Sequence, residues 1–295
     1  MIGHPTVPDA NSLYVDAGGR RLHYLRAGDA DDPAVVLLHG SGIDDAALSW
    51  HHAIPALAEN YRVYAPDWPG YGESPDPETE PDGAYYQAVL TDFLEAIRAD
   101  QPSLVGLSMG GGAALGVAMD SPDAIRSLVL VDSYGLRDAV PGGSAAYVLA
   151  NAPFARTVGQ QLAGMLPGAA RSTIAPFVAE ADDLDPAFLA AVSDRLDDPD
   201  AGRAFVDFQR AEFSPDGVRT HFEDRLHELD VETLVVNGAS DPLIPLAWAE
   251  DAAGTIPAAS LSVIEDCGHW PPRERPEAFL AAIEPFLAAS AGRSA

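Results

Sequence analysis

The sequence contains no lysine, and all 17 of its basic residues are arginine. This absence excludes three kinds of site that depend on a lysine side chain: the phosphate-binding P-loop, the Schiff-base enzyme and the Ser–Lys dyad. The basic residues are also few, since they face 45 aspartate and glutamate residues and leave a formal net charge of −28 at pH 7. Nucleic acids and anionic membranes repel a chain this acidic, so we expect neither as a partner.

The excess of acidic residues bears on the salt concentration in which the protein functions. A GC-rich genome favours Ala, Arg, Asp and Gly over Lys, but this bias alone does not produce an excess of 28 acidic residues. In a salt-rich cytoplasm, counterions screen the repulsion between like charges and make such a composition tolerable. We therefore hypothesise that the protein comes from a halophile.

Cysteine is nearly absent, since Cys267 is the only one in the chain. A single cysteine excludes an internal disulfide, and the sequence has no CxxC, HExxH or clustered His/Cys pattern that would bind a metal ion. We expect neither a metal nor a cofactor. We interpret Cys267 as a small, buried, apolar side chain.

Long hydrophobic runs are absent as well. The first residues, MIGHPTVPDANS, lack the basic start and the apolar stretch of a secretion signal, and no window approaches the roughly 18 uninterrupted apolar residues that would cross a bilayer. The 295 residues, of which 47% are hydrophobic, are nonetheless enough for a substantial core. We expect a soluble cytoplasmic protein.

Short apolar runs that alternate with helical stretches predict an α/β fold. Alternating apolar residues on either side of Gly18-Gly19 indicate a tight antiparallel hairpin near the N-terminus. Continuous runs rich in β-branched residues follow, as in strands buried on both faces of a parallel sheet; they span 34–39, 61–66, 102–107, 126–132, 232–238 and 260–265. The amphipathic stretch 85–99 is typical of the helices between such strands. We predict a mostly parallel, doubly wound sheet.

The alternation of strands and helices is interrupted between two of these runs. From about residue 134 to residue 230 no strong strand pattern occurs, and Ala-rich helical segments such as 145–166 and 186–196 take its place. An interval of this length is too long for an ordinary loop. We therefore predict a core formed by residues 1–133 and 231–295, with a helical cap inserted at 134–230.

The glycine-rich segment at 104–116, LVGLSMGGGAALG, follows one of the predicted strands. Its glycines fit no register of the dinucleotide-binding G-x-G-x-x-G motif, but they do fit G-x-S-x-G, with Ser108 between Gly106 and Gly110. In that motif a strained strand-to-helix turn raises the serine hydroxyl above the sheet edge, where helix N–H groups face any oxyanion that forms. Ser108 is therefore a candidate nucleophile.

A serine nucleophile needs a base within hydrogen-bonding reach and a third group that orients the base. Of the eight histidines, His269 is the candidate base, because it lies in the predicted loop between the last strand and the last helix. Asp241 follows the strand at 232–238 at the carboxyl edge of the sheet, where catalytic groups gather in open α/β folds. Asp132, at the end of another strand, is the competing acid.

Five segments resemble, in content and order, the signature blocks of the α/β-hydrolase fold superfamily. They are HGSG at 39–42, DWPGYGES at 67–74, GLSMGG at 106–111, NGASDPLIP at 237–245 and GHWPPRERP at 268–276. The resemblance covers essentially the whole chain except the predicted cap. It implies Ser108 as the nucleophile, His269 as the base and Asp241 as the acid that orients the base.

The resemblance also implies an oxyanion hole and a reaction class. The hole would be formed by the backbone N–H groups of Met109 and of Ser41, or of its neighbour Gly42. Epoxide hydrolases and haloalkane dehalogenases of this superfamily have an aspartate at the nucleophile position, so Ser108 points instead to acyl transfer on a small-molecule substrate.

Within the serine branch we predict a carboxylic-ester hydrolase that acts on small or medium apolar acyl groups. The alternative is a carbon–carbon bond hydrolase of ring-cleavage diketones, because such enzymes often have a Trp after the catalytic His, as Trp270 is here. They commonly have Asn before the nucleophile and the segment HGGGPG, whereas this chain has Leu107 and HGSG. A cofactor-free perhydrolase, suggested by Met109 after the serine, and a non-enzymatic ligand receptor are the other hypotheses.

The composition predicts that molar salt stabilises the protein. We expect a higher melting temperature in molar KCl than in dilute buffer, because salt screens the repulsion among the acidic side chains. Thermal unfolding followed by circular dichroism in the two buffers measures the difference. A melting temperature that does not rise with salt would contradict the halophile hypothesis.

Overall fold

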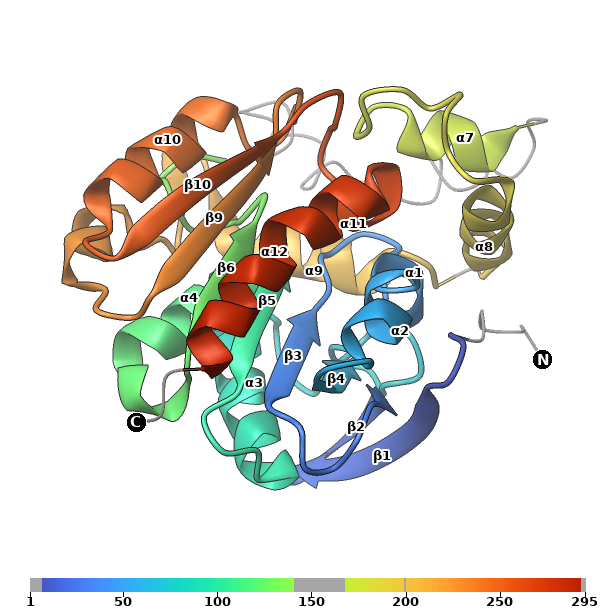
Figure 1. Cartoon of the computed structure of the whole chain (residues 1–295). Helices are drawn as coiled ribbons and strands as arrows, with labels where there is room; N and C mark the ends of the chain where they lie inside the picture. Colours follow the sequence, from blue (N-terminus) through green and yellow to red (C-terminus); the bar gives the residue numbers. More distant parts are fainter. Residues whose placement is uncertain (1–6, 141–167, 199, 293–295) are drawn as a thin grey trace.

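The structure is a computed structural model that describes residues 7–140, 168–198 and 200–292 (Figure 1). In these ranges eight strands form one sheet, in the order β1-β2-β4-β3-β5-β6-β9-β10. Along the chain the strands are β1 (Asn11–Ala17), β2 (Arg20–Ala27), β3 (Ala34–Leu38), β4 (Arg62–Pro66), β5 (Ser103–Leu107), β6 (Leu128–Val131), β9 (Thr233–Gly238) and β10 (Ala259–Ile264). β2 pairs antiparallel with β1 and β4, and the remaining pairs are parallel. The predicted fold class is confirmed.

The predicted strands lie within two residues of the observed ones. The β1–β2 hairpin turns at Gly18 and Gly19, whose φ angles are 60° and 83°. Positive φ at both central residues is the geometry that this kind of two-residue turn requires, and glycine adopts it without a steric penalty.

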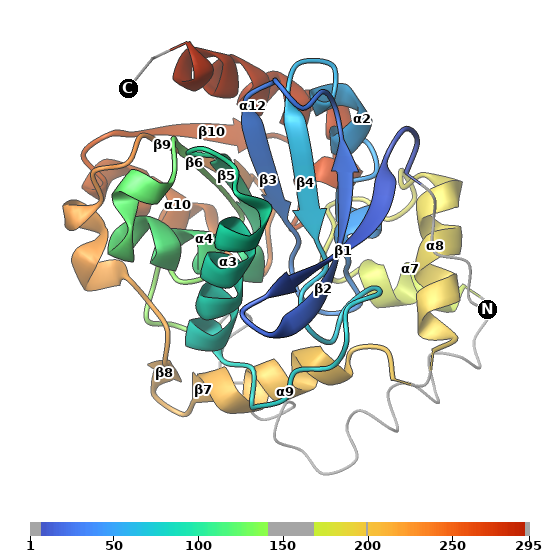
Figure 2. The ribbon, with the colours of Figure 1, turned by 90° about the horizontal axis from the view of Figure 1, so that it is seen from below.

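Helices cover both faces of the sheet, because alternate residues of each parallel strand are apolar on opposite sides. In β3, Val36 and Leu38 pack in one core cluster while Val35 and Leu37 pack in the other. Helices α3 (Gly83–Ile97), α4 (Met109–Asp120) and α10 (Leu246–Thr255) contribute to the first cluster, and α1 (Ala46–Ser49), α2 (Ala53–Leu57) and α12 (Pro276–Ala291) contribute to the second. Figure 2 shows α12 and α2 on one side of the strands, opposite α3 and α4.

Between β6 and β9 the chain leaves the sheet. Its described elements are α7 (Ala169–Ile174), α8 (Pro186–Leu196), α9 (Arg203–Glu212), the hairpin of β7 (Phe213–Ser214) and β8 (Gly217–Val218), and the 3-10 helix η2 (Glu223–Glu228). Helix α8 coincides with the helix predicted at 186–196, and the hairpin was not predicted, because strands of two residues are too short to show a period. The helix predicted at 145–166 lies outside the described residues, and the cap limits 134–230 remain a prediction. In the described ranges no helix is both long and apolar enough to cross a bilayer.

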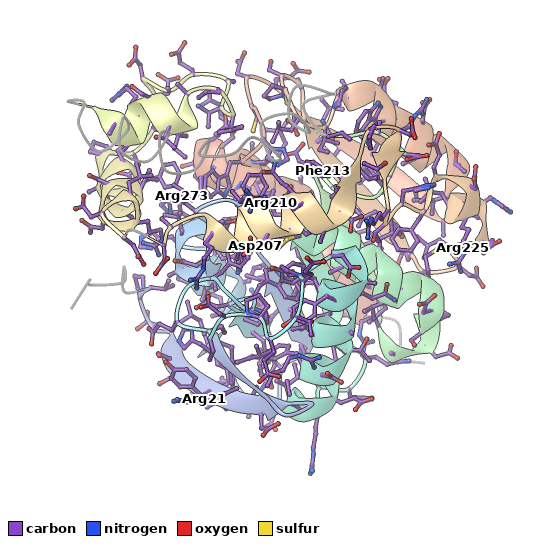
Figure 3. All side chains as sticks on the ribbon, turned by 180° about the vertical axis from the view of Figure 1, so that it is seen from behind. Arg21, Asp207, Arg210, Phe213, Arg225 and Arg273 are labelled. Carbon is purple, nitrogen blue, oxygen red and sulfur yellow. The ribbon has the colours of Figure 1, made fainter. Side chains whose placement is uncertain are left out.

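A partly buried arginine, Arg195, and a buried one, Arg273, lie where the segment between β6 and β9 meets the core. Arg195 of α8 forms an ion pair with Asp45, whose side chain is almost completely buried. Arg273, in α11 (Pro271–Glu274), has its guanidinium carbon 4.4 Å from the ring centroid of Phe188 in α8. Arg273, labelled in Figure 3, is only 7% exposed, and among the described residues its Nε and Nη1 atoms have no hydrogen-bond partner. Burial lowers the pKa of Arg273 to about 10, so the group is still charged at neutral pH.

We expect substitution of these two arginines by methionine to change the free energy of unfolding in opposite directions. Arg195→Met leaves Asp45 buried without its cation, and we expect the free energy of unfolding to fall by about 3–5 kcal/mol. Arg273→Met replaces a buried charge that lacks a full set of partners with an apolar side chain of similar length. We expect a gain of about 1 kcal/mol, because the relief of burying the charge exceeds the loss of the contact with Phe188. Urea unfolding of both variants and the wild type tests the contrast, which a loss of stability in Arg273→Met would contradict.

Candidate active site

Ser108 lies in a strained turn between β5 and α4. Its φ and ψ angles are 50° and −116°, a combination that L-residues rarely adopt. Three backbone hydrogen bonds fix this conformation. The Ser108 N–H donates to the carbonyl of Val131 in β6 at 2.9 Å, and the Ser108 carbonyl accepts from the N–H groups of Gly112 and Tyr134 at 3.1 and 3.0 Å. The neighbouring strand and the first turn of α4 therefore hold the serine in place.

The two glycines of the G-x-S-x-G motif are required by close backbone contacts. A methyl group on Gly106 would lie 2.6 Å from the carbonyl oxygen of Gly110 and from the Cα of Gly111. A methyl group on Gly110 would lie 2.4 Å from the carbonyl oxygen of Leu38 in β3. Carbon atoms do not approach so closely, so a side chain at either position would push α4 away from the sheet.

The structure brings Ser108, His269 and Asp241 together at the carboxyl edge of the sheet. His269 follows β10, and its Nε2 is 3.0 Å from the Ser108 Oγ. Asp241 follows β9, and its Oδ2 is 2.7 Å from the Nδ1 of His269. The other oxygen of Asp241 accepts from the backbone N–H groups of Leu243 and Ile244 at 2.7 and 3.1 Å. These bonds direct one carboxylate oxygen at the imidazole.

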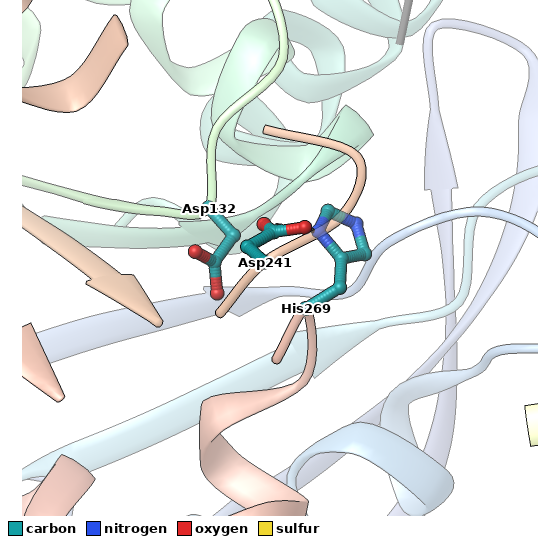
Figure 4. A group of neighbouring side chains, drawn as sticks. All are labelled: Asp132, Asp241 and His269. Atoms are coloured by element: carbon teal, nitrogen blue, oxygen red, sulfur yellow. Dashed lines mark hydrogen bonds and ion pairs between the residues drawn. The ribbon is translucent and has the colours of Figure 1, made fainter. Parts of the chain in front are cut away.

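Asp132, the competing acid, lies beside Asp241 rather than on His269 (Figure 4). It follows β6 directly and has a φ of 41°. Its Oδ1 accepts from the N–H of Gly238 at 2.9 Å, whereas its Oδ2 is buried and has no hydrogen-bond partner in the part of the chain that the structure describes. Burial and then the charge of Asp241 raise the pKa of Asp132 well above its usual range.

Ligand atoms of Asp132, Asp241 and His269 lie within 4.8 Å of one another, a spacing that could hold a metal ion. A metal-binding imidazole nitrogen must be free of its proton. Here the Nδ1 of His269 is 2.7 Å from the Asp241 Oδ2, and a hydrogen bond of that length requires a proton between the two atoms. The arrangement fits proton transfer better than cation binding.

The loop after β3 lies against Ser108. A methyl group on Gly40 would be 3.4 Å from the Ser108 Cβ. Ser41 and Gly42 follow Gly40 in this loop, and Gly42 has a φ of 87°. Met109 begins α4 directly after the serine, where helix N–H groups have no partner within the helix. The loop and Met109 therefore flank Ser108, as an oxyanion hole requires.

His39 supports this loop. Its Nδ1 donates to the carbonyl of Gly40 at 2.8 Å, and its Nε2 accepts from the N–H of Trp68 at 3.1 Å. This pattern requires the neutral tautomer with the proton on Nδ1. Complete burial lowers the pKa of His39 to about 4, in agreement with that assignment.

Glu274 holds the loop that carries His269, and sequence reasoning missed it. Its Oε2 accepts from the backbone N–H groups of Gly268 and Ala179 at 2.9 and 2.8 Å, and its Oε1 accepts from that of Trp270 at 2.9 Å. Ala179 belongs to the segment between β6 and β9. Glu274 lies within the recognised block GHWPPRERP, but its partners are distant backbone groups that no local pattern reveals.

Asp44 is a second residue that the sequence did not single out. It is buried, and its Oδ2 accepts from the N–H of Gly40 at 2.9 Å and from the hydroxyl of Ser49 at 2.6 Å. Ser49 in turn accepts from the indole N–H of Trp270 at 2.7 Å. Burial raises the pKa of Asp44 to about 8. This chain of bonds connects the residue after His269 to the loop beside Ser108.

Comparisons with known proteins agree with this architecture. The family model for the alpha/beta hydrolase fold matches residues 33–276. The chain is 32% identical to a 2-hydroxymuconate semialdehyde hydrolase of Pseudomonas sp. (strain CF600), over 95% of each chain. It is 30% identical to a 2-hydroxy-6-oxo-6-(2'-aminophenyl)hexa-2,4-dienoic acid hydrolase of Metapseudomonas resinovorans, over 93% of this chain and 90% of the relative. An uncharacterized protein of Mycobacterium tuberculosis is 29% identical over 91% of this chain and 79% of the relative.

Solved structures share the fold. A serine hydrolase involved in carbazole degradation superposes with a TM-score of 0.75 at 28% identity, covering 95% of this chain and 99% of that one. A bacterial membrane phospholipase A superposes with a TM-score of 0.80 at 23% identity, which shows a common fold alone. The matched family model covers most of the chain, and the sheet, the helices and the order of the five blocks agree with it. The chain therefore belongs to the α/β-hydrolase fold family.

Proposed function

We propose that the chain is a serine hydrolase that works through an acyl-enzyme, with Ser108 as its nucleophile. The observation that carries the proposal is the continuous hydrogen-bonded path from Asp241 through His269 to Ser108, with contacts of 2.7 and 3.0 Å. A serine hydroxyl is a weak nucleophile unless a base stands within hydrogen-bonding distance and a third group fixes the base. Both conditions are met at this turn.

In the first step the Ser108 Oγ attacks a carbonyl carbon of the substrate, and His269 Nε2 takes the hydroxyl proton. The carboxylate of Asp241 holds the imidazole in the required tautomer and stabilises the imidazolium that forms. The carbonyl oxygen becomes an oxyanion. The N–H groups of Met109 and of Ser41, or of Gly42, would bind it, and each such donor contributes about 10²–10³-fold to the rate.

The same groups complete the turnover. His269 returns its proton to the leaving group as the bond from the carbonyl carbon breaks, which leaves the acyl group on Ser108. A water molecule then attacks the acyl carbon while His269 takes one of its protons, and the second tetrahedral intermediate releases the acid and restores the serine. One water is consumed and no oxidant or reductant is needed.

The substrate that we propose is a carboxylic ester with a small or medium apolar acyl group. An apolar surrounding next to the base supports this choice: Trp270, which follows His269, packs edge-on against the buried Phe188 of α8 at a centroid distance of 5.3 Å. The residue before the nucleophile, Leu107, is buried in the core and offers no polar group.

The second candidate is the hydrolysis of a carbon–carbon bond in a ring-cleavage diketone. The relatives at 30% and 32% identity are named as hydrolases of 2-hydroxy-6-oxo-6-(2'-aminophenyl)hexa-2,4-dienoic acid and of 2-hydroxymuconate semialdehyde, and Trp270 follows the proposed base. Here the leaving group is a carbon atom, which keeps the electron pair of the broken bond and takes a proton. The same Ser108 attack serves both reactions, so the leaving group distinguishes them.

Substitution of the nucleophile tests the proposed mechanism. We expect Ser108→Ala to lower kcat on p-nitrophenyl butyrate by about 10⁴-fold or more and to abolish labelling by a fluorophosphonate probe. Ser133→Ala is the matched control, because the buried Ser133 hydroxyl donates to the carbonyl of Tyr134 and takes no part in the hydrogen bonds that join Asp241, His269 and Ser108. The control is expected to keep both labelling and turnover. A wild type that neither labels nor turns over would favour a receptor, and an equally active Ser108→Ala would exclude the proposed nucleophile.

A direct competition separates the two substrate classes. We expect kcat/KM for p-nitrophenyl butyrate to exceed that for a 2-hydroxy-6-oxohexa-2,4-dienoate, because Leu107 and the HGSG loop lack the groups common in the carbon–carbon hydrolases. Steady-state kinetics on both compounds measure the ratio. A ratio in favour of the dienoate, lost in Ser108→Ala, would establish the second candidate instead.

A further inference from the structure

Two carboxyl groups share one buried space behind His269. Asp132 is fully buried and the side chain of Asp241 is fully buried as well. Figure 4 shows Asp241 between Asp132 and the imidazole. Two negative charges this close in a medium of low dielectric repel strongly, so one of the two carboxyls must carry a proton at neutral pH.

Hydrogen bonding decides which carboxyl is ionised. Asp241 receives three donors: the N–H groups of Leu243 and Ile244 and the imidazole Nδ1–H. A carboxylate with several donors is stabilised in its charged form. Within the described ranges Asp132 receives one donor, the Gly238 N–H on Oδ1, and its Oδ2 has none. A proton on that Oδ2 would remove an unsatisfied charged oxygen and create a donor within reach of Asp241.

The other titratable groups around Asp132 do not favour its ionisation. Asp241 comes from the loop after β9, His269 and Cys267 come from the loop after β10, and Glu274 comes from α11. The charges of Asp241 and Glu274 both disfavour a carboxylate at Asp132. Burial raises the pKa of the Cys267 thiol above its usual range, so this neighbour is neutral too. The group in this cluster that can become a cation is His269.

We propose that Asp132 is a positioning residue: a neutral carboxylic acid whose Oδ2–H donates to the Asp241 carboxylate, so that the pair presents a single negative charge to His269. One charge balances the imidazolium that forms during turnover. A second would hold the proton on His269 and slow its transfer to the leaving group. The kinetic consequence rests on the proposed function, whereas the protonation state of Asp132 does not.

Asp132→Asn imitates the protonated acid. Its amide oxygen can accept from the Gly238 N–H, and its amide N–H can donate to Asp241. Since the charge behind His269 does not change, we expect the imidazole pKa, followed by NMR titration, to match that of the wild type. We also expect kcat/KM to stay within about threefold. Were Asp132 ionised in the wild type, the substitution would remove a negative charge and lower the pKa of His269 by about one unit or more.

Infrared spectroscopy observes the proton directly and needs no substrate. At pH 7 we expect the wild-type spectrum to contain the carbonyl stretch of a protonated carboxylic acid that Asp132→Asn lacks. Asp132→Ser also removes the carboxyl and should lose the same band. This variant serves for the infrared comparison if Asp132→Asn does not fold. Asp44→Asn is the control for a different buried carboxyl, whose band would lie apart from that of Asp132.

Unfolding measured against pH gives a second result that does not depend on activity. In the unfolded chain Asp132 has the ordinary pKa of an aspartate, whereas in the folded chain its pKa is raised, so folding takes up one proton at neutral pH. As the pH rises above the ordinary pKa of an aspartate, the wild-type free energy of unfolding should therefore fall relative to that of Asp132→Asn. The slope of this difference against pH should correspond to one proton. The proposal would be overturned, whatever the substrate is, by three results together. The carbonyl band would be the same in wild type and Asp132→Asn, the two proteins would have equal slopes of stability against pH, and the pKa of His269 would be lower in the variant.

Discussion

The backbone strain at Ser108 is the constraint on which the site depends. A residue with φ of 50° and ψ of −116° persists because three backbone hydrogen bonds and two close glycine contacts leave no alternative. These contacts come from β3, β5, β6 and α4. The centre of the sheet therefore positions the serine, and the loops after β9 and β10 need only bring their side chains to the same edge.

Several aspartate carboxyl groups are buried, and different interactions stabilise them. Asp67 pairs with His23 at 2.7 Å, and Asp45 pairs with Arg195. Asp44 has a raised pKa and accepts from a serine hydroxyl and from backbone N–H groups. Asp132 has one backbone donor and a neighbouring carboxylate. A chain with 45 acidic residues thus places several of them around its candidate site, where protonation, and not only ion pairing, limits the buried charge.

The sequence predicted the sheet and proposed the three residues that the structure brings together at its edge, and it missed the residues that support them. Strands buried on both faces leave continuous apolar runs, and the carboxyl ends of β5, β9 and β10 meet at one edge, which brings Ser108, Asp241 and His269 together. The importance of Glu274 could not be predicted, because its partners include the backbone of Ala179, nearly a hundred residues away. Burial raises the pKa of both Asp44 and Asp45, and Asp45 also forms an ion pair with Arg195. The two residues are adjacent and chemically identical, so only packing distinguishes their surroundings.

Mass spectrometry of the chain during turnover can capture the proposed acyl-enzyme on Ser108. Wild-type protein mixed rapidly with p-nitrophenyl butyrate and quenched with acid within the first turnover should carry one butyryl group, and peptide mapping should place it on Ser108. We also expect a burst of p-nitrophenol equal in amount to the acylated chain. Two results would contradict an acyl-enzyme on Ser108. One is turnover without any acylated chain at a time when the burst is complete, and the other is a butyryl group on a residue other than Ser108.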